Sequence, residues 1–178
     1  NENLPTFVVL PDHRGLASNG TKNWDSAFLP AQHQGTVIYP GTKTPVEDLF
    51  PDEHARFITR AGDKAGIDLL AQLNRDHALA RPGDERLDAR IKSYELAAKM
   101  QLAVPEVMDT SEETAETQKL YGLDNPTTAP YGRMCLVARR LSERGVRVVQ
   151  VYDGGGWRGG WDAHGKLQPC LDAFDGQL

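Results

Sequence analysis

The chain has 178 residues, enough for one domain with a hydrophobic core, and 39% of them are hydrophobic and 25% charged. Its mean hydropathy of −0.51 is low for a compact domain, which predicts a large polar surface or an incomplete core. The net charge of −5, with basic residues scattered among acids, argues against a nucleic-acid partner, because phosphate binding needs clustered Lys and Arg. The sequence contains no apolar run long enough to span a membrane.

Two short apolar segments near the N-terminus predict strands. The first is Phe7–Leu10, stopped by a proline, and the second covers residues 35–39, closed by a Pro-Gly pair. Residues 12–34 between them are rich in Gly, Asn, Pro, Asp and His and show no period. They predict a long loop, and long ordered loops in compact domains are often functional.

Helical periodicity predicts a helical region over residues 63–144. The first helix is expected at residues 63–79, with a stripe toward its neighbour formed by Ile67, Leu70, Ala71, Asn74 and Ala78. The second is expected to begin at the Asp84 cap and to end at Pro105, because proline has no backbone N–H. Its expected apolar stripe is Leu87, Ile91, Tyr94 and Ala98.

Two further helices are predicted before the last strand. Thr110 and Glu113 fit a capping box, in which each side chain satisfies the other residue's free backbone N–H, so a short helix is expected there, closed by Gly122. The last helix is expected over residues 130–144, followed by a Gly145 cap. Its expected buried stripe comprises Tyr131, Met134, Cys135, Ala138 and Leu141.

The strongest predicted strand is Val146–Tyr152. A helix, a glycine and then a β-branched strand form the second half of an α/β unit, so the sequence predicts the α/β class. Asp153 and a Gly-rich segment leave the carboxyl end of this strand, the edge at which open α/β sheets bind ligands. If the first strand runs parallel to this one, Asp12, His13 and Arg14 stand at the same edge.

Several short segments occur in a specific order along the chain: Phe7–Asp12, Asn23–Trp24, Ala27–Ala31, Leu69–Asn74, Ser93–Ala97, Leu120–Gly122, Cys135–Leu141 and Gly159–Gly165. Together they resemble the family called domain of unknown function 1501, a sulfatase-like branch of the alkaline phosphatase superfamily. The resemblance runs from about Leu4 to Gly165. It implies a single partial sulfatase-like domain over residues 1–178, with a helical layer and few strands, lacking part of the central sheet.

The resemblance also implies a longer protein. Family members carry an upstream segment with the nucleophile and early metal ligands, and a downstream segment with a late Asp-His pair. Neither is found here, so we expect the chain to be an internal fragment of a metal-dependent ester hydrolase that is inactive alone. The alternative is an exported, non-catalytic binding or structural protein with the same fold. An export signal is usual in the family, which implies an extracytoplasmic location.

Asp162 and His164 are the candidate metal ligands. They flank one residue in a Gly-rich loop, and carboxylate with imidazole is a common pair for a divalent metal, although zinc needs three or four ligands. The resemblance implies zinc or calcium and metal-assisted hydrolysis of a small-molecule or carbohydrate sulfate or phosphate ester. Asp153 could be a further metal ligand or could orient His164 from outside the ligand set, but a turn residue at the strand end is the favoured interpretation, since Asp often forms turns.

Two residues of the early loop are candidates for substrate binding. Arg14 could bind a sulfate or carboxylate in bidentate fashion. Trp24 could stack on a sugar ring, but packing of the loop against the helices is the favoured interpretation. The remaining His residues are interpreted as surface residues, and acid–base runs such as Glu112–Glu113 and Arg139–Arg140 as solvated faces.

A Gly-x-Gly-x-x-Gly match also lies after the last strand, at Gly154, Gly156 and Gly159. A dinucleotide site would need a helix to begin there and an acidic residue at the end of a second strand. The sequence predicts neither. The glycines are therefore interpreted as residues that let the backbone bend or approach an anion.

Overall fold

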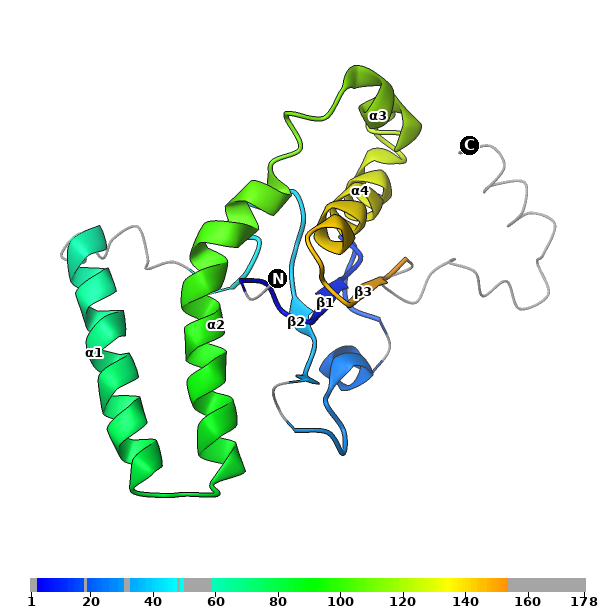
Figure 1. Ribbon diagram of the computed structural model, residues 1–178. Coiled ribbons are helices and arrows are strands. Elements are labelled where there is room, and N and C mark those ends of the chain that lie inside the picture. The colour runs from blue at the N-terminus through cyan, green and yellow to red at the C-terminus, as the bar shows by residue number, and fades with distance from the viewer. Residues whose placement is uncertain (1–2, 18, 31–32, 48, 50–58, 154–178) are drawn as a thin grey trace.

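The computed structural model describes residues 3–17, 19–30, 33–47, 49 and 59–153. In chain order the elements are β1 (Phe7–Leu10), the 3-10 helix η1 (Gly20–Trp24), β2 (Thr36–Val37), α1 (Arg60–Leu79), α2 (Glu85–Met108), α3 (Ala115–Leu120), α4 (Ala129–Glu143) and β3 (Val148–Val151) (Figure 1). The predicted α/β class and the four predicted helices are confirmed.

The three described strands form one parallel sheet with the order β2-β1-β3. Val8 pairs with Thr36 on one side of β1, and Leu10 pairs with Val151 on the other. The first and last predicted strands are therefore parallel neighbours, and their carboxyl ends lie at one edge. The four α-helices of the described residues lie between β2 and β3 in the chain. Parallel strands need such a crossover, because a tight turn cannot join them.

The hydrophobic core lies between one face of the sheet and two helices. Figure 1 shows α4 and the C-terminal half of α2 beside the strands. Burying each aliphatic side chain completely stabilises the fold by roughly 1.5–3 kcal/mol relative to leaving it exposed. The buried cluster comprises Leu4, Val8, Leu10, Ile38, Leu49, Met100, Val104, Val107, Met134, Val137, Leu141 and Val146.

The opposite face of β1 packs against the early loop. Val9 is fully buried there, and Gly35 lies so close that an added Cβ would be 2.8 Å from Val9 Cγ2 and 2.9 Å from Trp24 Cβ. Only glycine fits at this position without a shift of its neighbours. The close approach brings η1, which ends in Trp24, onto the sheet.

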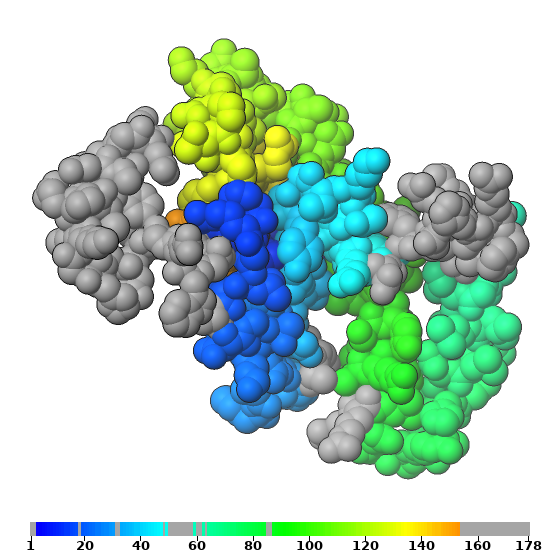
Figure 2. Space-filling model, turned by 180° about the vertical axis from the view of Figure 1, so that it is seen from behind, coloured from blue at the N-terminus to red at the C-terminus, as the bar shows by residue number. Residues whose placement is uncertain are grey.

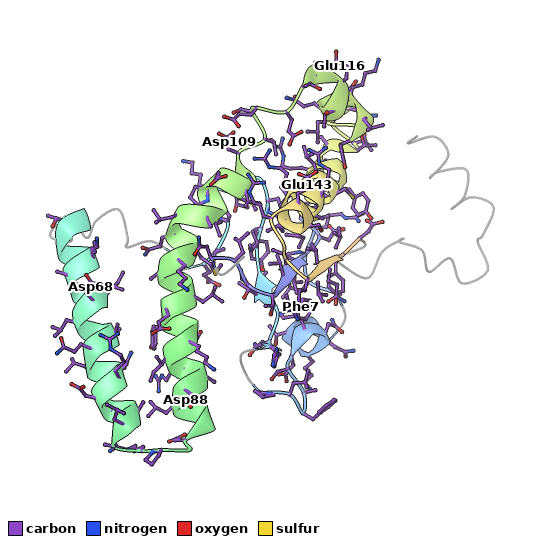
Figure 3. The ribbon with its side chains drawn as sticks, viewed as in Figure 1. Phe7, Asp68, Asp88, Asp109, Glu116 and Glu143 are labelled. Carbon is purple, nitrogen blue, oxygen red and sulfur yellow. The ribbon has the colours of Figure 1, made fainter. Side chains whose placement is uncertain are left out.

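Helices α1 and α2 form a hairpin that extends away from the sheet (Figure 1). Figure 3 shows Asp68 on α1 and Asp88 on α2, both well away from Phe7 on β1. The predicted Asp84 cap is confirmed, because Leu87 N donates to Asp84 Oδ1 at 3.1 Å. The half-buried positions of α1 match the predicted stripe except for Leu70, which is exposed; they are Ile67, Ala71, Asn74 and Ala78.

The expectation that Pro105 ends the second helix is wrong, because α2 continues to Met108. A proline inside a helix removes one hydrogen bond and crowds the preceding turn. Here Val104 and Val107 on either side of Pro105 are buried in the core, and this tertiary packing outweighs the local cost.

The expected capping box is also wrong. Helix α3 begins four residues later than Thr110 would place it, with Thr114 as its cap, and Thr117 N donates to Thr114 Oγ1 at 3.2 Å. The Glu113 carboxylate instead binds two arginines of α4. The predicted closure at Gly122 holds, since this residue adopts the left-handed conformation with φ of 66°.

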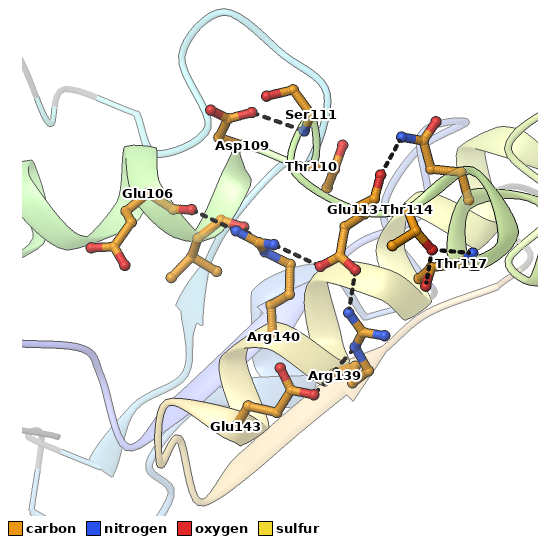
Figure 4. Close-up of polar contacts among 12 residues, drawn as sticks. Glu106, Asp109, Thr110, Ser111, Glu113, Thr114, Thr117, Arg139, Arg140 and Glu143 are labelled. Carbon is orange, nitrogen blue, oxygen red and sulfur yellow. Dashed lines mark hydrogen bonds and ion pairs between the residues drawn. The ribbon is translucent and has the colours of Figure 1, made fainter.

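Arg139 and Arg140 do not form a solvated face with their acidic partners, contrary to expectation. Arg140 is 7% exposed and donates from Nε to Val107 O and from Nη2 to Glu106 O, both at 2.9 Å (Figure 4). Its Nη1 lies 2.7 Å from Glu113 Oε1, and Arg139 Nη2 lies 2.6 Å from Glu113 Oε2. Arg140 thus satisfies carbonyls at the C-terminal end of α2, where a helix lacks its own donors.

We predict that the ion pairs of Glu113 stabilise the fold near neutral pH and that this stabilisation is lost in acid. Hydrogen bonds from Arg139 and then Arg140 hold the pKa of Glu113 below its ordinary value of 4.5. A lowered folded pKa gives stability that is fully present above the unfolded pKa and is lost as pH falls through the folded pKa. We therefore expect the original chain to have a higher free energy of unfolding in urea than Glu113→Gln. This difference should be constant near neutral pH and should shrink toward about pH 3. An advantage independent of pH would contradict the ion pairs.

The buried surface of helix α4 is wider than the single stripe of residues that the sequence predicted. Tyr131 is 43% exposed, so its expected burial is wrong. The helix packs on the sheet with one side and on α2 and the segment around α3 with another, which a single stripe does not describe. Its buried residues are Gly132, Met134, Leu136, Val137, Arg140 and Leu141. Among the described helices, none is both long and apolar enough to cross a membrane.

Candidate functional site

Three charged side chains meet at the carboxyl edge of the sheet. Arg14 donates to Asp12 twice, from Nε to Oδ1 at 2.9 Å and from Nη2 to Oδ2 at 2.6 Å. The same Nη2 donates to Asp153 Oδ1 at 2.8 Å. One guanidinium therefore joins a carboxylate that follows β1 to a carboxylate that follows β3. We call Asp12, Arg14 and Asp153 the strand-end cluster.

Strand register explains why these side chains meet. Asp12 stands two residues after Leu10, and Asp153 stands two residues after Val151, the pairing partner of Leu10. The pairing extends one step beyond the strands, because Tyr152 N donates to Leu10 O at 3.0 Å. The chain then turns sharply after Asp12, whose Oδ1 accepts from Arg14 N at 2.7 Å, and this turn directs Arg14 back over the edge.

The electrostatics of the cluster limit what Arg14 can bind. The Asp12 side chain is 1% exposed, so its charge needs a partner, whereas Arg14 is 48% exposed. The hydrogen bond to Asp12 raises the pKa of Arg14, which stays charged at every pH the protein tolerates. Two carboxylates on one guanidinium leave a net charge of about −1. Two of the three guanidinium nitrogens are engaged, which weakens the expectation that Arg14 binds a substrate anion.

Trp24 packs behind this edge. Its side chain is buried, with 2% exposed, and its ring meets Tyr152 edge-on with 5.7 Å between centroids and 64° between planes. This arrangement agrees with the packing interpretation of Trp24. A ring buried to this extent offers no open face to a sugar.

Tyr131 and Cys135 on α4 lie near the cluster and were not recognised in the sequence as site residues. Burial raises the pKa of Cys135, and burial together with Cys135 raises the pKa of Tyr131; the charge of Asp153 contributes to both. A thiol with a raised pKa is a poor nucleophile at neutral pH. The helical spacing of Tyr131 and Cys135 in the sequence predicts that they share a face of α4. It does not predict that this face lies near Asp153.

Comparison with known families gives one match, to the model described as "Protein of unknown function (DUF1501)", over residues 1–174. The chain belongs to the DUF1501 family. No curated protein and no solved structure matches it.

The predicted metal ligands of this DUF1501 chain, Asp162 and His164, lie outside the described residues. So does the Gly-x-Gly-x-x-Gly match. Within residues 3–153, leaving out the gaps given above, no group of three or more His, Cys, Asp or Glu side chains is placed to hold a metal ion. Asp153, the last described residue, pairs with Arg14 at 2.8 Å.

Proposed function

We propose that this DUF1501 chain forms part of the site of a metal-dependent sulfate or phosphate ester hydrolase with an alkaline phosphatase-like fold. The observation that supports this most is the strand-end cluster. It gathers Asp12, Arg14 and Asp153 at the edge where α/β sheets bind ligands. In the sequence, the Gly-rich segment that leads to Asp162 and His164 follows directly after Asp153.

In this proposal Asp162 and His164 hold a divalent metal, zinc or calcium. When bound, the metal would supply positive charge that stabilises the oxygens of the ester. Asp153, which Arg14 binds, acts in this proposal as a positioning residue that orients His164. The proposed substrate is a small-molecule or carbohydrate ester, and the proposed location is extracytoplasmic, as the family resemblance implies.

Two ligands are fewer than the three or four that zinc takes in proteins. We therefore expect weak metal binding by the chain alone, and hydrolysis of 4-nitrophenyl sulfate or phosphate at or below detection. Calorimetric titration of metal-free protein with Zn²⁺ and Ca²⁺ tests the ligands. Asp162→Asn and His164→Ala should each weaken binding at least about tenfold, and Arg14→Gln should weaken it less, because it acts through Asp153.

His77→Ala is the matched control, since this exposed histidine lies on α1, away from the sheet edge. It should leave metal affinity unchanged. Equal affinity in the original chain and in both ligand variants would overturn the metal site. A protein that binds no metal and hydrolyses neither ester would favour the alternative, a non-catalytic binding or structural protein.

A further inference from the structure

A cavity of about 480 Å³ opens next to the strand-end cluster. Its walls come from three separate parts of the chain: the end of β1, the segment after β2 and the first turns of α4. Figure 2 shows these segments, in blue, cyan and yellow, meeting on one face of the molecule. The residues that matter for its chemistry are Asp12, Leu16, Tyr39, Pro130, Arg133 and Met134.

Most of the wall is apolar and rigid. Pro11, Pro40 and Pro130 contribute rings whose φ angles are fixed, and Leu16 and Tyr39 add apolar surface. The volume lies within the range of small-molecule sites, which are mostly apolar, largely preformed and contain a few polar groups. Such walls suit a ring-shaped ligand more than a chain of hydroxyl groups.

His13 lines this cavity with its Nδ1 3.3 Å from Asp12 Oδ1, and the second basic group of the wall is Arg133. It is half-buried, and its Nη1 donates to Thr110 Oγ1 at 3.2 Å. A Cβ added to Gly41 would lie 3.2 Å from Arg133 Cδ, so the backbone of the segment after β2 packs against the arginine stem. Across the described part of the chain no carboxylate lies within ion-pair distance of Arg133, whereas Arg14 pairs with two carboxylates and Arg140 with one.

The start of α4 adds little to this charge. Ala129 N already donates to Asn125 O at 2.8 Å, and Pro130 has no N–H. Arg14 pairs with the Asp12 carboxylate in the wall and with Asp153, so the strand-end cluster keeps a net charge of about −1 and does not attract an anion. The recognition of an anion in this cavity therefore rests on the Arg133 guanidinium.

We propose that the cavity binds a small organic anion that carries a ring, such as an aryl sulfate or an aryl carboxylate. The ring packs between the proline rings, Leu16 and Tyr39, and the anionic group pairs with Arg133. This inference concerns binding alone. It goes beyond the proposed hydrolysis and does not require a metal.

Titration of the full chain with 4-nitrophenyl sulfate, followed by ligand-observed NMR, tests the proposal, with 4-nitrobenzoate as the carboxylate probe. Arg133→Met should weaken binding of both probes at least about tenfold, and Arg133→Lys should restore part of it. Ala129→Leu, which adds a side chain to the cavity wall, should also weaken binding. Arg144→Met, at the C-cap of α4, is the control and should bind normally.

Inorganic sulfate and 4-nitrophenol, which each carry half of the recognised chemistry, should bind at least about tenfold more weakly than the aryl sulfate. Circular dichroism shows whether each variant folds. If Arg133→Met does not fold, Ala129→Leu still tests whether the cavity binds the probes. Absence of aryl-anion binding by the original chain would overturn the proposal. So would binding by Arg133→Met and Ala129→Leu as tight as that of the original chain, or inorganic sulfate binding as tightly as the aryl sulfate. Metal affinity that is unchanged in Asp162→Asn and His164→Ala, with aryl-anion binding retained, would count against the proposed hydrolase site alone.

Discussion

Gly132→Ala is expected to lower the free energy of unfolding by about 3 kcal/mol or more, because the added methyl group has no room. A Cβ at Gly132 would overlap the carbonyl oxygen of Tyr121, which is backbone and cannot rotate away. Helix α4 or the segment after α3 must then shift, which disturbs the packing of α4 on the sheet. Urea unfolding followed by circular dichroism measures the loss.

Gly66→Ala is the matched control, and its effect should have the opposite sign. Gly66 lies inside α1 with nothing within 4 Å of its added Cβ. Alanine favours a helix over glycine by up to about 1 kcal/mol, so this variant should be slightly more stable. If Gly132→Ala were as stable as the original chain, the close contact between α4 and the end of α3 would be refuted.

Arg140→Met should destabilise the protein by about 3 kcal/mol, the second-largest effect expected. Methionine retains the apolar stem but leaves the carbonyls of Glu106 and Val107 without their donors, and Glu113 with one arginine. For a chain of this size the melting temperature should fall by about 6–12 °C. Thermal unfolding followed by circular dichroism measures this change.

Arg144→Met makes the same substitution one helical turn later. Arg144 binds Glu106 Oε1 at 3.1 Å, but that glutamate side chain is 73% exposed, so the loss should stay below about 1 kcal/mol. Similar losses in the two variants would show that Arg140 does not secure α2 to α4.

Sequence patterns predicted the helices and strands correctly where interactions between residues close in the chain determine them. The apolar run Phe7–Leu10 became a strand, Asp84 capped a helix, and Gly145, with φ of 85°, closed another. Predictions failed where distant packing decides. Pro105 looked like a helix end because its cost is local, whereas the burial of its neighbours depends on β1 and α4.

The sequence made Arg14 a candidate for substrate binding and Asp153 a candidate for supporting a metal ligand, which are separate roles. Their contact depends on the parallel register of β1 and β3, which no local pattern specifies. A signal was present: Asp12 and Asp153 each follow the last residue of a strand by two positions. Arg133 gave no such signal, because the cavity it lines joins three segments that are distant in sequence.

The pairing of β1 with β3 has a kinetic consequence. Arg14 and Asp153 are 139 residues apart, so the contact between the strand ends closes nearly the whole described chain. The α1–α2 hairpin needs only short-range contacts and should form early, whereas the sheet must await synthesis of β3 and should form slowly. The strand-end cluster is therefore assembled in a late step of folding, and its formation reports that β1 and β3 have paired.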